Sequence, residues 1–373
     1  MKKAILVSCF GWYAERLKYI EEILKREGLS VEIYSSDFSH LKKCRTEKNQ
    51  NCNYVHVPSY KKNLSLARLY SHAVFSYKIF QILKENKPDF IYALVPPNSV
   101  LKACAEYKKL NRNSFLVYDI IDMWPESYTG SKLLQYPFKI WRDLRDKNLV
   151  YADHVFTECD LYKSFIPVNI NSISTLHLCR EEVLPYTAKE WDGHNLDIAY
   201  LGSINNIIDI PLISQLLYYL SKKMKVNFHI VGGGESKDLL INTVIDSGVQ
   251  VVDHGIIFEK SQMREIVSGC HFAINMMKKK VCVGLTIKSM DYFQLGVPLF
   301  NTIKADTTDI IKKYNCGFNV VNVQETVDQV MSLNSESYEK MREKTHKVFL
   351  ENFTTEVFKR EFENTLSSIH IIK

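Results

Sequence analysis

A lysine and an aspartate three positions apart, Lys288 and Asp291, stand in a stretch whose apolar spacing predicts a helix over 284–295. Side chains three positions apart share a helix face, so the ammonium and the carboxylate would point the same way. Gly296 and Pro298 mark the end of this helix. An ammonium so placed can neutralise a diphosphate, and a carboxylate can accept hydrogen bonds from ribose hydroxyls. A surface ion pair one turn apart would explain the same spacing more simply.

Two loops rich in small residues follow neighbouring strands, which are predicted at 227–231 and 196–201. Their small or polar residues are Gly232, Gly233, Gly234, Gly202, Ser203 and Asn205. Where side chains are missing, backbone N–H groups and the next helix N-terminus can meet a phosphate or a ribose. A tight connection alone would account for one or two of the glycines. Because parallel strands end at the same sheet edge, the two loops predict a ligand crevice, and His254 would border its base pocket.

An acidic segment closes a strand in the first half of the chain. Asp122 and Glu126 flank the pair Trp124-Pro125 just after the strand predicted at 115–120. A carboxylate at the carboxyl end of a strand can orient or deprotonate the hydroxyl group of a substrate. Asp122 is our candidate for this role, with Glu126 as its substitute. Alternatively, Asp122 caps a helix and Trp124-Pro125 serves packing.

The first strand, predicted at 4–9, leads into Phe10, Gly11 and Trp12. Only Gly11 matches the Gly-x-Gly-x-x-Gly pattern that brings backbone close to a dinucleotide pyrophosphate, so a dehydrogenase is disfavoured. One glycine at the carboxyl end of a strand still lets a substrate approach. The three residues are therefore candidates for substrate binding, although an ordinary tight turn fits equally well.

Short apolar runs alternate with longer segments of helical period, the pattern of parallel sheets covered by helices on both faces. Strands are predicted at 4–9, 31–34, 54–57, 90–95, 115–120, 154–157 and 173–176, and then at 196–201, 227–231, 249–252, 272–276, 298–301 and 318–320. Helices are predicted at 13–27, 63–86, 97–110 and 131–150, and then near 210–224, 235–247, 259–268, 284–295 and 305–314. The alternation of strands and helices starts again in the second half, so we expect an α/β protein with two doubly wound domains.

A polar stretch with Pro185 and Gly193 interrupts this pattern near 180–195 and predicts the linker between the domains. The tail over 335–370 reads as two helices, long enough to cross from one domain to the other. The expected divisions are an N-terminal domain over 1–185, a C-terminal domain over 186–350 and a crossing helix over 351–373.

The composition excludes several classes of protein. Of 373 residues, 46% are hydrophobic and 24% are charged, as in soluble globular proteins, so disordered, collagen and coiled-coil chains are excluded. Residues 1–185 hold 27 basic and 20 acidic side chains, a net +7, and the rest of the chain holds 21 and 22, a net −1. This excess is mild and comes without a recognition motif, so we expect no nucleic-acid partner.

The residues that could bind metal or membrane give weaker signals. No Asp-x-Asp motif, no Cys-x-x-Cys pair and no histidine pair at ligand spacing occurs, so we expect no metal and reduced cysteines. No apolar run is long enough to span a bilayer, which favours a cytoplasmic protein. The stretch 60–84 interleaves basic with apolar residues and could lie on an anionic membrane surface, although a solvated face over a buried stripe is the commoner cause.

Taken together, the small-residue strand end, the glycine loop, the pattern Lys-x-x-Asp-Tyr-x-x-x-Gly-x-Pro and the terminal helices resemble a known family. The resemblance is to the retaining, family-4-like "group 1" glycosyltransferases of bacterial polysaccharide synthesis, which have the GT-B fold, and it covers nearly the whole chain. Asp291 matches the acidic residue that contacts the nucleotide ribose in that family, and Lys288 matches a lysine of one variant pattern. The segment from Asp122 is similar to an Asp-x-Trp-Pro-Glu-Ser segment that faces the cleft between the domains.

The resemblance implies two Rossmann-like domains with a cleft between them, a nucleotide-sugar donor on the C-terminal domain and an acceptor on the N-terminal one. The reaction would move a sugar from a nucleoside-diphosphate-sugar, a UDP-sugar favoured, to a lipid-linked, oligosaccharide or polysaccharide acceptor of capsule, exopolysaccharide or cell-surface glycan synthesis. It would need neither metal nor cofactor and would retain configuration. Phe10, Gly11, Trp12 and Glu126 would then contact the acceptor at the inner face of the cell membrane.

Within this implied mechanism, Lys288 and the helix N-terminus at Thr286 and Ile287 stabilise the departing diphosphate. Asp291 anchors the ribose, and Asp122 serves the acceptor hydroxyl. Val283 departs from the family pattern, because it stands where a first glutamate contacts the donor sugar. Two alternatives stay open: a nucleotide-sugar 2-epimerase of the same architecture, and a non-catalytic sugar-nucleotide-binding partner of another transferase.

Overall fold

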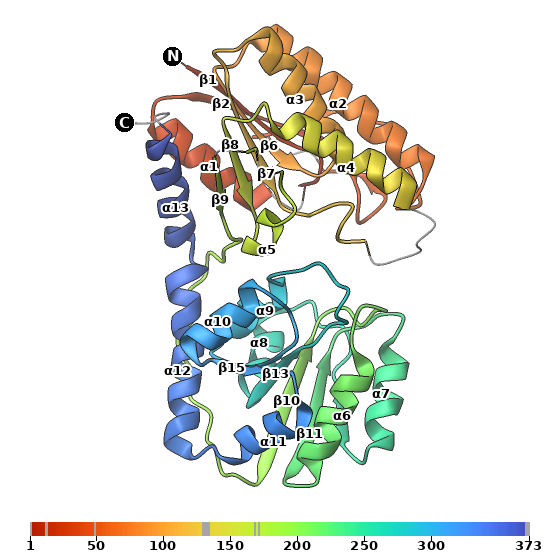
Figure 1. Ribbon diagram of the computed structural model, residues 1–373, viewed down its shortest axis with the longest axis vertical. Helices are drawn as coiled ribbons and strands as arrows, with labels where there is room; N and C mark the ends of the chain where they lie inside the picture. The colour runs from red at the N-terminus through yellow and green to blue at the C-terminus, as the bar shows by residue number, and fades with distance from the viewer. Residues whose placement is uncertain are drawn as a thin grey trace. The chain divides into compact units, whose positions relative to one another are not determined.

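Two parallel β-sheets, each flanked by helices, organise the chain (Figure 1). The computed structural model describes residues 2–11, 14–47, 50–128, 135–167, 169–170 and 172–369. The chain divides into two compact units, Met1–Leu178 with Phe358–Lys373, and Cys179–Val357. The sequence placed the domain boundaries near 185 and 350, whereas in the structure the units divide after Leu178 and after Val357.

The sheet of the first unit has the strand order β5-β2-β1-β6-β7-β8-β9, and every neighbouring pair is parallel. Its strands are β1 (Lys3–Ser8), β2 (Ser30–Ser36), β5 (Asn53–Val55), β6 (Phe90–Val95), β7 (Phe115–Ile120), β8 (His154–Thr157) and β9 (Ile173–Thr175). All six residues of β6 are buried, as a strand covered on both faces requires. Strands β2 and β5 are added on one side of β1, and the strands from β6 onwards are added on the other side. The topological switch point of this sheet therefore lies between β1 and β6.

Helices cover both faces of this sheet (Figure 1). They are α1 (Ala14–Arg26), α2 (Leu66–Asn86), α3 (Asn98–Leu110), α4 (Gln135–Leu149), the short α5 (Asp160–Lys163) and α13 (Thr355–Ser368). An antiparallel pair, β3 (Phe38–Ser39) and β4 (Cys44–Arg45), extends from the end of β2. On α13, Phe362 packs against Tyr92 and Phe156 of the sheet, so the C-terminal helix completes the core of the first unit.

A buried ion pair joins the elements of this unit. Arg16 of α1 donates to both oxygens of Asp119 on β7, over 2.5 and 2.9 Å, and also to the carbonyl of Leu176 over 2.8 Å. Both charged side chains are almost fully buried. Tyr92 of β6 donates a further hydrogen bond to Asp119, and the ring of Phe358 on α13 lies 5.0 Å from the guanidinium.

The second sheet has the strand order β12-β11-β10-β13-β14-β15, again parallel throughout. Its strands are β10 (Asn195–Leu201), β11 (Lys225–Val231), β12 (Gln250–Asp253), β13 (Phe272–Asn275), β14 (Leu299–Asn301) and β15 (Gly317–Asn319). Its helices are α6 (Ile210–Ser221), α7 (Lys237–Asp246), α8 (Lys260–Ser268), α9 (Ile287–Gln294), α10 (Asp306–Tyr314), α11 (Val323–Met331) and α12 (Ser335–Asn352). Alternate residues of β10 and β11 enter one apolar core, and the switch point lies between β10 and β13.

The α/β class and the two doubly wound domains expected from the sequence are confirmed. The predicted strands at 90–95, 115–120 and 154–157 have the bounds of β6, β7 and β8. The predicted helix at 284–295 is shorter in the structure, because α9 begins at Ile287. Thr286 caps it by accepting a hydrogen bond from the backbone of Ser289, and Lys288 therefore lies in the first turn.

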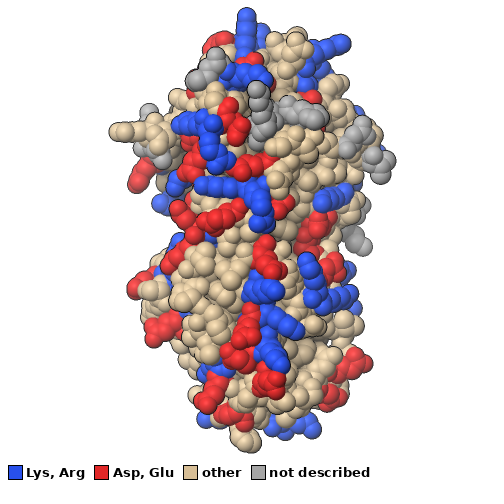
Figure 2. Space-filling view, turned by 90° about the vertical axis from the view of Figure 1, so that its left-hand side faces the viewer, with Lys and Arg blue, Asp and Glu red and all other residues tan. Residues whose placement is uncertain are grey.

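Basic and acidic side chains lie interspersed on the face that Figure 2 shows. Two ion pairs of this mixed kind join α13 to α1, Lys359 with Glu22 at 2.7 Å and Arg26 with Glu363. The excess positive charge of the first half therefore does not gather into one patch on that face. Among the described residues, no helix is long and apolar enough to cross a membrane.

Removing one partner of the Arg16–Asp119 pair should destabilise the first unit more than removing both. We expect Asp119→Ala to lower the free energy of unfolding by about 3 to 5 kcal/mol, because it leaves a buried guanidinium without its counter-ion. The double variant Arg16→Met with Asp119→Leu should recover part of this loss. Urea unfolding followed by circular dichroism measures both, and a double variant less stable than Asp119→Ala would contradict the interpretation.

Candidate functional site

Three loops meet by backbone contact at the carboxyl edge of the second sheet. Gly202 after β10 donates to the carbonyl of Val231 over 2.9 Å, Ile204 donates to Gly233 over 2.8 Å, and Gly232 donates to Gly255 over 2.8 Å. A Cβ added at Gly232 would lie 2.0 Å from the carbonyl oxygen of Gly202. The glycine is therefore required for the close approach of the loops. Two of the amides expected to face a ligand, those of Gly202 and Gly232, donate instead to the end of β11 and to the loop after β12.

The other expected residues of these loops are held in place locally. Ser203 accepts a hydrogen bond from the Tyr200 hydroxyl through its backbone carbonyl over 2.8 Å, and the Asn205 side chain accepts one from the Ile207 amide over 3.2 Å. A Cβ added at Gly234 would lie 2.3 Å from the carbonyl oxygen of Ile204. The loops thus form a rigid edge beside the switch point of the sheet.

Lys288 lies against this edge. Its Nζ is 4.2 Å from the centre of the Tyr200 ring, the geometry of a cation–π contact. Among the described residues, no carboxylate forms an ion pair with it, and burial lowers the pKa of Lys288 to about 7. A partly buried ammonium without a carboxylate, in the first turn of a helix, favours an anionic ligand.

Asp291 pairs with a residue that the sequence did not suggest. Its Oδ1 accepts from Nε and Nη2 of Arg180 over 3.0 and 2.8 Å, so the expected carboxylate is held by an arginine rather than by Lys288. Neither contact uses Oδ2. Tyr292 is fully buried; its hydroxyl accepts from the Leu201 amide over 2.8 Å and donates to the Ile274 carbonyl. Tyr292 therefore ties α9 to β10 and β13, the strands on either side of the switch point.

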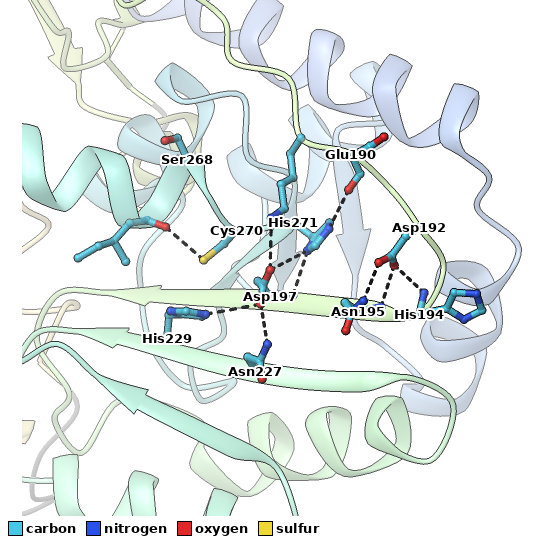
Figure 3. Close-up of polar contacts among 12 residues, drawn as sticks. Glu190, Asp192, His194, Asn195, Asp197, Asn227, His229, Ser268, Cys270 and His271 are labelled. Atoms are coloured by element: carbon cyan, nitrogen blue, oxygen red, sulfur yellow. Dashed lines mark hydrogen bonds and ion pairs between the residues drawn. The ribbon is translucent and has the colours of Figure 1, made fainter.

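A polar network lies along β10 and β11, nearer to the amino-terminal ends of these strands than the loops (Figure 3). Asp197 accepts from the Asn227 side chain over 2.8 Å and lies 3.6 Å from His229, and its backbone amide donates to His271 over 2.9 Å. Burial opposes ionisation of Asp197, but the Asn227 hydrogen bond and the charges of His271 and Lys189 outweigh it and lower its pKa.

His254 connects this network to the loop edge. Its Nε2 lies 3.1 Å from Nδ1 of His229, with the two rings stacked. The adjoining Gly255 accepts the hydrogen bond from Gly232. The ring of His254 is therefore engaged by His229, and its expected place beside a nucleotide base stays a prediction.

The first unit contains a cavity of about 340 Å³ at the carboxyl ends of β6 and β7. Asp122 lines it, and its role at a substrate hydroxyl stays a prediction. Burial raises the pKa of Asp122. A hydrogen bond from Ser127 and the charge of Arg68 lower this pKa, but burial outweighs them. A carboxylate with a raised pKa is a stronger base, which suits proton removal from a hydroxyl group.

Glu126 does not line this cavity. It forms ion pairs with Arg142 and Arg145 of α4, both at 2.7 Å. Burial opposes its ionisation, but the hydrogen bonds and charge of Arg145 outweigh this and lower the pKa of Glu126. Its place in the structure is a link from the β7 loop to α4, and the role of substitute for Asp122 has no geometric support.

The residues expected after the first strand lie elsewhere. Phe10 is buried, with its ring edge-on to His72 at 5.6 Å. Phe10 and the exposed Gly11 line a separate hollow of about 320 Å³ beside α1. Trp12 lies outside the described residues.

Three cavity residues were not identified as site residues by sequence analysis. They are Arg68, His72 and Asn98, and each has a buried side-chain atom without a hydrogen-bond partner among the described residues. Arg68 was visible only as one of many basic residues of the first half. Nothing in the spacing of His72 or Asn98 distinguishes them from ordinary helix residues, so only the fold reveals them.

The pKa of Lys288 can be measured directly. After reductive methylation with ¹³C-formaldehyde, NMR should show one lysine signal that titrates near the value of about 7. That signal should be missing from Lys288→Arg and present in Lys313→Arg, where the replaced lysine also lies over a tyrosine ring but is exposed. If all signals titrate near the ordinary lysine value of about 10.4, the burial argument is wrong.

The chain is similar in structure to several glycosyltransferases. It matches the lipopolysaccharide outer core galactosyltransferase WaaB in its apo form with a TM-score of 0.70 and 14% identity over 99% of each chain. It matches Anabaena HepE in complex with UDP with a TM-score of 0.69 and 14% identity, over 99% of this chain and 100% of that chain. It matches sucrose-phosphate synthase from Thermosynechococcus elongatus with a TM-score of 0.69 and 9% identity over 99% of each chain.

At these identities the comparison establishes the fold, and the chain has the GT-B fold that its sequence motifs suggested. No protein-family model matches the sequence, and no curated protein matches it either.

Proposed function

We propose that the chain is a glycosyltransferase that moves a sugar from a nucleoside-diphosphate-sugar, a UDP-sugar favoured, to an acceptor hydroxyl. The observation that carries the proposal is Lys288, a partly buried ammonium without an ion-pair partner among the described residues, at the switch point of the second sheet. Ligands of doubly wound sheets bind at such a point. The structural neighbour HepE was solved with UDP and with UDP-glucose, which supports a uridine donor.

The donor's diphosphate would bind Lys288 and the helix N-terminus at Thr286 and Ile287. Breaking the bond between the anomeric carbon and the phosphate oxygen leaves the electron pair on the diphosphate, and the ammonium stabilises this charge. Oδ2 of Asp291 would accept a hydrogen bond from a ribose hydroxyl, while Arg180 holds the carboxylate in position through Oδ1.

The acceptor would bind in the cavity of the first unit. Its hydroxyl oxygen forms the new bond to the anomeric carbon, and its proton passes to Asp122. Retention of configuration, independence from metal and cofactor, and a role in capsule, exopolysaccharide or cell-surface glycan synthesis are proposed on the resemblance of the sequence. The same holds for an acceptor that is lipid-linked or part of a polysaccharide, and for contact with the inner face of the cell membrane.

Nucleotide binding tests the donor site. Calorimetric titration with UDP, GDP, TDP and CDP should show binding of one nucleotide without magnesium. Lys288→Ala should weaken this binding by about 1.5–3 kcal/mol, the range for a charge-assisted hydrogen bond, whereas Lys313→Ala should leave it unchanged. If no nucleotide binds the wild-type protein, the donor site is wrong. If a nucleotide binds but no acceptor is ever glycosylated, the chain is a sugar-nucleotide-binding partner, and epimer formation without acceptor would indicate a 2-epimerase.

The affinity for the nucleotide should fall as the pH rises. In the free protein the pKa of Lys288 is lowered to about 7, so above this pH the amine is mostly neutral. A bound diphosphate raises this pKa, and binding therefore takes up a proton. Between about pH 7 and about pH 9 we expect a loss of up to about tenfold per pH unit, which calorimetry in buffers of different ionisation enthalpy measures.

Lys288→Arg is the matched variant for the pH dependence, because a guanidinium stays charged over this range. It should bind the nucleotide with an affinity that no longer changes with pH. A wild-type protein whose affinity is equally independent of pH would show that Lys288 does not contact the diphosphate.

A further inference from the structure

The cavity of the first unit has two different surfaces. One is an apolar wall. Leu66 and Leu69 contribute to it from the first turn of α2, Leu64 from just before that helix, and Phe138 and Trp141 from α4. Leu64 is 53% and Leu66 is 84% exposed, so this wall continues from the cavity to the surface of the unit. Large apolar side chains left exposed beside a cavity indicate that part of the ligand is apolar.

The other surface is polar and lacks partners. Nε of Arg68, Nε2 of His72 and Oδ1 of Asn98 are buried and have no hydrogen-bond partner among the described residues. His72 is 8% exposed and Asn98 is 1% exposed. Buried polar atoms are almost always hydrogen-bonded in native proteins, so three unpartnered atoms lining one cavity point to a polar ligand group that satisfies them.

Arg68 gives this polar surface its charge. Its Nη1 donates to the carbonyl of Asn63 over 2.9 Å. The charge of Asp122 acts on Arg68, but within the described part of the chain no carboxylate forms an ion pair with the guanidinium. His72, its neighbour on α2, is kept neutral, because burial and the charge of Arg68 lower its pKa to about 3. Asp122 is the acid that lines the cavity. An arginine with an unpartnered donor binds phosphate or carboxylate in preference to neutral groups.

We infer that the cavity binds an amphiphilic acceptor, a single molecule with a phosphate group at Arg68 and an apolar chain along the leucine and aromatic wall. That this ligand is an acceptor rests on the proposed function, in which the glycosylated hydroxyl would lie near Asp122. It selects a lipid-linked acceptor over a polysaccharide chain, because a polar glycan would leave the leucines of the wall in water. The binding itself needs no donor and can be tested alone.

Octyl phosphate below its micelle concentration is the probe, with octyl glucoside and inorganic phosphate as the two half-ligands. The fluorescence of Trp124 and Trp141, which line the cavity, reports binding. We expect octyl phosphate to bind at least about tenfold more tightly than either half-ligand, because it uses both surfaces of the cavity.

Two variants separate the two surfaces. Arg68→Gln should weaken octyl phosphate at least about tenfold and leave octyl glucoside nearly unchanged, because only the charge-assisted contact is lost. Leu66→Asn should weaken octyl phosphate and leave inorganic phosphate unchanged. Arg112→Gln and Leu110→Asn are the matched controls, since both positions are exposed in the same unit and lie outside the cavity lining. Circular dichroism melting of each variant confirms that it is folded.

Equal binding of octyl phosphate and octyl glucoside would overturn the inference, and so would an effect of the two control variants as large as that of the cavity variants. Binding to phosphatidylglycerol vesicles without binding of octyl phosphate would also overturn it and indicate a bilayer surface instead. A nucleotide titration of the same preparation separates the two proposals. If the nucleotide binds and octyl phosphate does not, only the acceptor class is wrong; if octyl phosphate binds and no nucleotide does, the cavity stands and the proposed function fails.

Discussion

The parallel direction of every pairing in the two main sheets is the constraint on which the rest of the structure depends. A parallel strand must be followed by a crossover, usually a helix, before the chain re-enters the sheet, so all carboxyl ends of the strands collect at one edge. This brings the loops at Gly202 and Gly232 together although they lie in different parts of the sequence. In the first unit the same rule places Asp122, after β7, beside Asn98, which opens the helix after β6.

Buried charge distinguishes the structural from the candidate functional residues. Arg16 is buried with Asp119, and the pair with its added hydrogen bonds is complete without a ligand. Lys288 and Arg68 lose part of their hydration without forming an ion pair with a carboxylate among the described residues, although the charge of Asp122 acts on Arg68. A charge buried without a partner destabilises the folded protein, and an anionic ligand would offset that cost on binding. The two cations lie in different units, which matches a reaction that joins two substrates.

The sequence predicted the fold well because apolar runs and helical spacing are local signals that both sheets obey. It predicted the position of α9 and of Lys288 for the same reason, and missed the start of the helix by the few residues that the Thr286 cap decides. The sequence did not predict the ion pair between Asp291 and Arg180. Arg180 is 111 positions away, in a stretch that reads as a linker, and only the folded second unit brings the two side chains together.

The glycine loops show how a motif can mark the right place for a reason other than the one first given. The small residues at Gly232 and Gly234 predicted amides open to a ligand, whereas the structure shows that a side chain at either position would collide with the neighbouring loop. Their first task is therefore to let three loops pack into one rigid edge. A ligand site needs a rigid edge. Tyr200, whose ring lies under Lys288, belongs to β10, and the loop that follows β10 is one of the three packed loops. The glycine motif thus helps to position Lys288, and its backbone amides do not take the place of the lysine charge.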